Sequence, residues 1–196
     1  ADSGIFASDD GGASWRAFNT GLPTEFGTYN LGIGNLVADA QYVYVGANAN
    51  SSQGIYRSTH GASASWSLVH GLGNGRDAVL VRTATSLCLW SPQDYRFGVE
   101  YSLDSGATWI KGSGFGYPAP GDFSNNAAPS AIAGTALSAD GTRLYANNVG
   151  NARLYRSDDG CKTFSSSAPS SFSNIDPPRA LGVSLAGVLY VAGASG

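Results

Sequence analysis

The chain has 196 residues, a formal net charge of −3 and only 13% charged residues. It shows no basic surplus and no run of about 18 apolar residues, so nothing indicates nucleic-acid binding or a membrane span. The length favours one compact domain. Lys is scarce, with two copies against nine Arg, and Ser and Gly are abundant. This composition favours an extracytoplasmic or secreted protein.

Short apolar runs recur along the chain, separated by Gly, Asn, Ser and Asp. Runs of this kind are typical of β-strands, and no stretch keeps a helical period for three turns. The sequence therefore predicts an all-β fold with almost no helix. In chain order the predicted strands include residues 4–7, 33–37, 42–45, 54–57, 78–83, 87–90, 98–101, 131–137, 144–147, 153–156, 180–185 and 189–192.

An octet with the frame Ser-x-Asp-x-Gly-x-x-Trp follows the first of these runs. It recurs in full at residues 102–109 and with Cys161 in the Gly position at residues 157–164. The copy at residues 58–66 is one residue longer and has His60 where the frame has Asp. Each octet lies between two predicted strands, and a fixed period of this kind indicates a repeat architecture.

The spacing of the aromatic residues that end the octets gives the number of repeats. Their gaps are 51, 43 and 55 residues, and the gap across joined termini would be 47 residues. Four-stranded units of roughly 40–50 residues are typical of propeller blades. The sequence predicts a single β-propeller domain, residues 1–196, with four blades of four antiparallel strands. The blades span about 33–70, 78–112 and 131–166, and both termini close the fourth, which joins 180–196 to 1–18.

Two other arrangements fit the same spacing of the repeats. The chain could be a four-blade piece of a larger repeat array, or two chains could combine their blades in an eight-bladed homodimeric ring. A blade shared by both termini would remove two exposed sheet edges. On this argument we expect the closed single chain.

The octet, placed between the third and fourth strands of a blade, resembles the Asp-box (BNR) repeat. The blade pattern covers essentially the whole chain. Sialidases, xyloglucanases, sorting receptors, photosystem assembly factors and lectin-like proteins share this motif, so it implies the β-propeller fold and not one activity. The residues assigned to structural Asp-box positions are Ser8, Asp10, Gly12, Trp15, Ser58, Trp66, Ser102, Asp104, Gly106, Trp109, Ser157, Asp159 and Phe164.

The chemistry of a hairpin explains these residue types. An Asp carboxylate accepts unpaired backbone N–H groups, Ser does so more weakly, and Gly adopts positive φ without strain. Asp10, Asp104 and Asp159 are thus expected to be turn residues, and His60 predicts a looser second hairpin. Cys88 is predicted in mid-strand and Cys161 at a hairpin tip of another blade, so no disulfide is expected between them.

Candidate binding residues lie in the long segments that join consecutive blades and in one loop between a second and a third strand. Variable loops on a repeating scaffold often carry function. Acids, Arg and aromatics are combined there, as in many carbohydrate sites. The candidates are Tyr29, Arg76, Asp77, Tyr95, Arg96, Tyr117, Asp122, Phe123, Asp176 and Arg179, with Glu25, Asp77, Asp122 and Asp176 as the carboxylates of a possible enzyme.

The sequence favours some functions over others. A sialidase is disfavoured because the chain has only two Glu, lacks an Arg-Ile-Pro sequence and is too short for six blades. No Gly-x-Ser-x-Gly motif supports a Ser-His-Asp enzyme. The leading hypothesis is a noncatalytic propeller that binds glycan, without a cofactor. A glycoside hydrolase of the xyloglucanase type, or a fragment of one, is the alternative. A protein–protein scaffold is the second alternative, and the four acids could also bind Ca²⁺ at the channel mouth.

Overall fold

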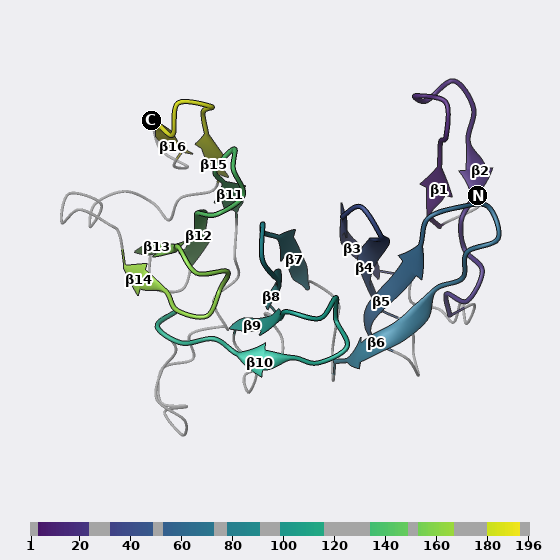
Figure 1. Cartoon of the computed structure of the whole chain (residues 1–196), viewed down its shortest axis with the longest axis horizontal. Helices are drawn as coiled ribbons and strands as arrows, with labels where there is room; N and C mark the ends of the chain where they lie inside the picture. Colours follow the sequence, from purple (N-terminus) through teal and green to yellow (C-terminus); the bar gives the residue numbers. More distant parts are fainter. Residues whose placement is uncertain are drawn as a thin grey trace. The chain divides into compact units, whose positions relative to one another are not determined.

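The structure is a computed structural model that describes residues 4–23, 32–48, 53–72, 78–90, 99–115, 134–148, 153–166 and 180–192. Sixteen β-strands in antiparallel sheets make up the regular structure of these residues, and no helix occurs within them (Figure 1). The all-β prediction is therefore confirmed. The residues that the structure describes hold no helix that could cross a membrane.

Twelve of the strands form three four-stranded sheets in which chain neighbours pair side by side. The first sheet holds β3 (Gly32–Ala38), β4 (Tyr42–Asn48), β5 (Gly54–Thr59) and β6 (Ser67–Gly71). The second holds β7 (Val79–Arg82), β8 (Leu87–Trp90), β9 (Val99–Ser102) and β10 (Ile110–Lys111). The third holds β11 (Thr135–Leu137), β12 (Leu144–Asn148), β13 (Arg153–Ser157) and β14 (Ser165–Ser166).

The remaining four strands form two separate two-stranded sheets. One contains β1 (Phe6–Ala7) and β2 (Arg16–Ala17), and the other contains β15 (Ala180–Val183) and β16 (Leu189–Ala192). No pairing joins β16 to β1 among the described residues, so no closed sheet is found. The connecting residues 193–196 and 1–3 lie outside the described ranges. Closure through both termini and the count of four blades therefore stay predictions.

The three complete sheets share one register between their second and third strands. Tyr44 pairs with Arg57 and Val45 with Tyr56 in the first sheet. The equivalent pairs are Cys88 with Tyr101 in the second sheet and Tyr145 with Arg156 in the third. The hydrogen-bonding register between the second and third strands is therefore the same in all three sheets, as the repeated sequence predicts.

The chain divides into two compact units, residues 1–80 and 81–196, and the division falls inside β7. In the first unit the β1–β2 hairpin packs on the β3–β6 sheet. Its hydrophobic core contains Ile5, Phe18, Leu22, Val45, Ala47, Tyr56 and Trp66. The Trp66 ring meets Phe18 edge-on at 5.2 Å between ring centroids.

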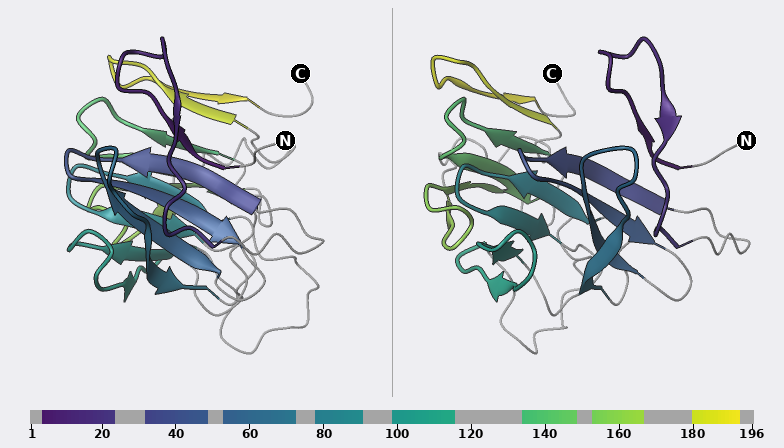
Figure 2. Two further views of the ribbon diagram at one scale, coloured as in Figure 1. Left: turned by 90° about the vertical axis from the view of Figure 1, so that its right-hand side faces the viewer. Right: turned by 45° about the vertical axis from the view of Figure 1, so that its right-hand side comes forward.

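The second unit has an aromatic core between its two complete sheets. Phe115 lies 4.7 Å from Tyr155 and 5.1 Å from Phe164 between ring centroids, and Trp90 lies 5.9 Å from Phe164. The β15–β16 hairpin follows in the chain, and β15 lies beside β11 (Figure 2). Adjacent sheets in this unit are therefore joined by apolar side chains, as expected of stacked repeats.

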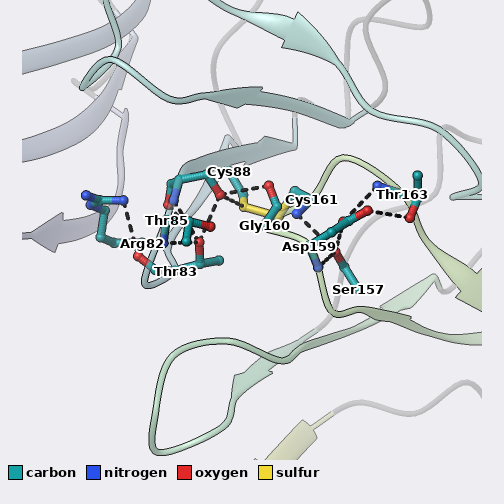
Figure 3. The surroundings of a disulfide bond; sticks show 10 residues. Arg82, Thr83, Thr85, Cys88, Ser157, Asp159, Gly160, Cys161 and Thr163 are labelled. Carbon is teal, nitrogen blue, oxygen red and sulfur yellow. Dashed lines mark hydrogen bonds between the residues drawn. A yellow bond between two sulfur atoms is a disulfide. The ribbon is translucent and has the colours of Figure 1, made fainter.

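A disulfide joins Cys88 to Cys161, with 6.1 Å between their Cα atoms (Figure 3). The sequence-based expectation that these residues stay unpaired is wrong. The tip of the β13–β14 hairpin lies against the start of β8 in the preceding sheet, where Ser86 Oγ donates to the Gly160 carbonyl at 2.7 Å. Cys161 keeps the positive φ of the Gly that it replaces, 70°. The pairing could not be anticipated because it depends on how two sheets stack.

Candidate functional site

The residues predicted to bind a ligand all lie outside the described ranges. They are Glu25, Tyr29, Arg76, Asp77, Tyr95, Arg96, Tyr117, Asp122, Phe123, Asp176 and Arg179. The structure therefore does not test whether these residues lie close together, and their roles stay predictions. The same holds for Ca²⁺ binding by the four acids, because none of them is among the described residues.

The described strands nevertheless determine where these segments attach. Neighbouring strands are antiparallel, so the second and fourth strands of each complete sheet run in the same direction and finish at the same end. We call this the loop end of a sheet. Segments 49–52, 91–98 and 149–152 follow second strands, while 73–77, 116–133 and 167–179 follow fourth strands. Nearly all candidate residues belong to segments that leave a sheet at its loop end.

The opposite end of each sheet, the hairpin end, carries the octets. In the first octet Asp10 accepts hydrogen bonds from the Ser8 hydroxyl at 2.8 Å, the Ser14 amide at 2.9 Å and the Ser14 hydroxyl at 2.6 Å. The Gly12 amide donates to Ser8 Oγ at 2.7 Å. Side chains thus accept the amides that the tight turn leaves without a strand partner.

The same network occurs in two further octets. Asp104 accepts from Ser102 and from the amide and hydroxyl of Thr108, and Gly106 N donates to Ser102 Oγ at 2.7 Å. Asp159 accepts from Ser157 and from both groups of Thr163. The octet is therefore a repeated hairpin lock built from one Ser and one Asp.

The locks change the acidity of their carboxyl groups. Hydrogen bonds from the hydroxyl and amide of Ser14, and from Ser8, lower the pKa of Asp10 to about 2. The equivalent donors, led by the Thr108 hydroxyl, lower the pKa of Asp104 to about 2. Partial burial opposes ionisation of Asp159, but the donors from Thr163 outweigh it and its pKa is also lowered. These acids are anionic acceptors and poor proton donors near neutral pH.

The hairpin at residues 58–66 lacks a carboxylate. Ser58 Oγ donates to the Thr59 carbonyl at 3.1 Å, and a ring nitrogen of His60 lies 2.9 Å from the Asp39 carbonyl oxygen. His60 is exposed and contacts the neighbouring turn of its own sheet. This turn is held by fewer side-chain contacts than the other three.

A further carboxylate turn, at Asp140, was not predicted from the sequence. Asp140 joins the first and second strands of the third sheet and accepts from the Ser138 hydroxyl at 2.6 Å and the Thr142 amide at 3.1 Å. The Ser138 hydroxyl, the Thr142 amide and the Thr142 hydroxyl lower its pKa to about 2. The sequence Ser-x-Asp-Gly-Thr at residues 138–142 could have indicated this turn, because it contains the same Ser-x-Asp pair as the octets.

Two contacts between consecutive sheets follow one pattern, which was not predicted from the sequence. Trp66 N donates to the Thr20 carbonyl at 2.8 Å, and Phe164 N donates to the Ser113 carbonyl at 2.8 Å. Thr20 and Ser113 lie shortly after the last strand of the preceding sheet. The aromatic that ends an octet therefore hydrogen-bonds the preceding sheet through its backbone.

A glycine follows each acceptor in this contact. Gly21 and Gly114 have φ of 85° and 81°, and a Cβ at either position would overlap the carbonyl oxygen of Trp66 or Phe164. Only Gly fits such a close approach of two backbones. The recurring signal is Thr20-Gly21-Leu22 and Ser113-Gly114-Phe115, in which the third residue is buried. We call this contact the seam between two sheets.

Of the other described charged residues, Glu100 in β9 is buried, while two ion pairs lie at the surface. Arg16 pairs with Asp9 at 2.9 Å, and Arg143 pairs with Asp158 at 2.7 Å. Exposed ion pairs of this kind contribute little to stability. Within the described ranges no group of three His, Cys, Asp or Glu could hold a metal ion.

Comparison with known proteins gives a fold neighbour and no family. No protein-family model matches the chain, and no curated protein matches it. A solved structure, "YCF48 bound to D1 peptide", superposes with a TM-score of 0.60 at 14% sequence identity. The match covers 97% of this chain and 54% of that chain, so this chain spans about half the length of the neighbour. At this level of identity the likeness establishes the β-propeller fold alone.

Proposed function

We propose that the chain is a noncatalytic binding propeller that recognises an extended segment of a partner protein through segments at the loop ends of its sheets. The observation that carries the proposal is the fold neighbour, because YCF48 is a β-propeller bound to a peptide. Within each compact unit, the locks and one seam hold the sheets, so each unit is a scaffold that keeps its own loops in position. The peptide bound by the fold neighbour favours the scaffold function over the glycan-binding function.

The chemistry of the loop segments supports a peptide ligand. Arg76, Arg96 and Arg179 can pair with carboxylates, and Asp77, Asp122 and Asp176 with basic side chains. Tyr29, Tyr95 and Tyr117 offer apolar rings with a hydroxyl for backbone groups, a combination enriched at protein interfaces. We also assign the hairpin locks to the Asp-box repeat and the three complete sheets to blades.

Glycan binding is the second candidate, and the aromatic and acidic residues of the loop segments favour it. Ring faces pack on sugar C–H groups while carboxylates take the hydroxyls. Hydrolysis would need a protonated carboxylic acid beside a second carboxylate. Asp10, Asp104 and Asp140 have pKa values near 2 and would not supply that acid. Glu25, Asp77, Asp122 and Asp176 stay the predicted carboxylates of such a hydrolase.

We place the protein in an oxidising, extracytoplasmic compartment. The Cys88–Cys161 disulfide uses both cysteines of the chain. Structural disulfides persist in such compartments and are rare in reducing ones. Mass spectrometry of the protein from its native source tests this, because free thiols at both positions would contradict it.

One binding experiment separates the candidates. The chain is applied to a peptide array and to a glycan array, and reducing sugar is measured in parallel. The double variant Tyr95→Ala/Arg96→Ala removes two loop-end candidates, and Arg143→Ala is the matched control at a hairpin end. We expect peptide binding that the double variant loses and the control keeps. Glycan binding without peptide binding, or release of reducing sugar, would overturn the proposal.

A further inference from the structure

The two seams share a backbone contact but differ in the side chains that hold them. In the first seam, which lies in the first compact unit, Trp66 donates its amide to the Thr20 carbonyl and its indole N–H to the Phe18 carbonyl at 2.7 Å. In the second seam, which lies in the second unit, Phe164 donates its amide to the Ser113 carbonyl, and its ring has no N–H to donate. The second seam therefore lacks the side-chain hydrogen bond of the first.

A disulfide stands beside the second seam instead. Cys161 lies three residues before Phe164 and is joined to Cys88 in β8, so it ties the tip of the β13–β14 hairpin to the second sheet (Figure 3). Next to Cys161, the Lys162 carbonyl accepts the Ser113 amide at 3.0 Å. The covalent link and the hydrogen bonds of the second seam thus join the same hairpin tip to the same sheet.

The turn that holds Cys161 is unfavourable for a cysteine with a free thiol. The equivalent residues of the two full octets are Gly12 and Gly106, with φ of 94° and 86°, and Cys161 has φ of 70°. Positive φ is costly for a residue with a side chain and not for Gly. A cross-link can offset this cost, whereas a free thiol cannot.

We propose that oxidation of Cys88 and Cys161 closes the second seam, whereas the first seam is closed in either redox state because its unit contains no cysteine. One S–S bond forms, and the two thiols pass two electrons and two protons to a disulfide oxidant such as glutathione disulfide, which becomes two thiols. In the reduced chain Cys161 is free to leave positive φ, and this draws Lys162 and Phe164 away from Ser113.

Closure of the second seam fixes the point from which segment 116–133 leaves the second sheet. Phe115 directly precedes this segment, and its ring lies 5.1 Å from Phe164 and 4.7 Å from Tyr155 between ring centroids. An open seam removes the contact with Phe164, so the segment no longer starts from a fixed position. The consequence for binding rests on the proposed function, because segment 116–133 carries candidate residues for the partner. The chain then binds its partner well only after its thiols are oxidised.

Amide hydrogen exchange tests closure of the second seam without any ligand. Residue-resolved NMR spectra compare the oxidised chain with the chain reduced by a phosphine. We expect the Ser113 and Phe164 amides to exchange about tenfold faster or more after reduction, because the link that holds the hairpin tip is broken. The Trp66 amide of the first seam is the internal control and should not change. The amides of the β12–β13 ladder show whether the third sheet stays folded.

Two variants separate the cross-link from the turn. Cys88→Ala/Cys161→Ala keeps a side chain at positive φ, so its Ser113 amide should exchange as fast as in the reduced chain. Cys88→Ala/Cys161→Gly restores the residue of the other octets and should exchange at an intermediate rate. Unchanged exchange at the second seam on reduction, an equal change at Trp66, or loss of protection throughout β12–β13 would overturn the proposal.

A binding measurement separates this proposal from the proposed function. Peptides that the oxidised chain captures on the array are titrated into the oxidised and the reduced chain. We expect the affinity to fall about tenfold or more on reduction, because a smaller fraction of the reduced chain has a closed seam. Equal affinity in both states would overturn the control of binding and leave the proposed function intact. Capture of no peptide by the oxidised chain would overturn the proposed function, while hydrogen exchange would still decide whether oxidation closes the seam.

Discussion

The complete sheets and the two-stranded sheets are built from the same repeat but differ in what covers them. Trp66 and Trp15 end equivalent octets, yet one is 3% exposed and the other 65%. Ser102 and Ser8 make the same turn hydrogen bonds, and only Ser102 is buried. Local sequence therefore determines the turn and the strand, while a neighbouring sheet determines the burial. Substitutions at equivalent positions of a complete sheet and a two-stranded sheet should therefore lower the free energy of unfolding by different amounts. That difference measures what the neighbouring sheet contributes.

The seam tryptophan should show the largest difference. Trp66→Ala removes a buried ring and a 2.7 Å hydrogen bond from its indole N–H to the Phe18 carbonyl, and should lower the free energy of unfolding by about 3–5 kcal/mol. Trp15→Ala removes an exposed ring and should change the free energy of unfolding by about 0.5 kcal/mol or less. Urea denaturation followed by circular dichroism measures both. Equal losses would show that exposure does not distinguish the two positions.

The disulfide should rank next. Cys88→Ala/Cys161→Gly removes a cross-link between residues 73 positions apart, and restores Gly at a turn of positive φ. We expect a net loss of about 2–4 kcal/mol in the free energy of unfolding, because the cross-link constrains the unfolded chain. Reductant should destabilise the unmodified chain similarly and leave the variant unchanged. A variant as stable as the unmodified chain would refute the structural role of the disulfide.

Substitution of the turn serines Ser102 and Ser8 should have a smaller effect on the free energy of unfolding than loss of the disulfide. Ser102→Ala leaves the Gly106 amide without its acceptor in a buried turn, which should cost about 1–3 kcal/mol in the free energy of unfolding. Ser8→Ala leaves the Gly12 amide in an exposed turn, where water can replace the hydroxyl. We expect a smaller loss in the same urea experiment. A larger loss from Ser8→Ala would contradict the account.

The acid dependence of the locks should be the smallest effect. The folded pKa of Asp104 is about 2, below the ordinary 3.8, so its ionised form stabilises the fold fully above pH 4. This contribution is lost as the pH falls from about 4 to about 2. Asp104→Asn keeps an acceptor oxygen without the charge and should make the thermal midpoint less dependent on pH in that window. An unchanged slope would show that the lock does not titrate there.

Sequence alone predicted the repeats well because turns and strands are local. The octet frame identified the hairpins at Asp10, Asp104 and Asp159, and apolar runs located the strands. The Cys88–Cys161 disulfide and the seam at Gly21 and Gly114 could not be predicted, since they depend on contacts between sheets. The candidate binding residues were selected by composition, and they lie in segments outside the described ranges.

Urea denaturation of Trp66→Ala beside Trp15→Ala tests most directly the claim that a neighbouring sheet determines which octet aromatics are buried and stabilising. The account predicts that Trp66→Ala, which loses a buried ring, lowers the free energy of unfolding by about 3–5 kcal/mol. It predicts a change of about 0.5 kcal/mol or less for Trp15→Ala, which loses an exposed ring. Equal losses from the two variants would contradict the account.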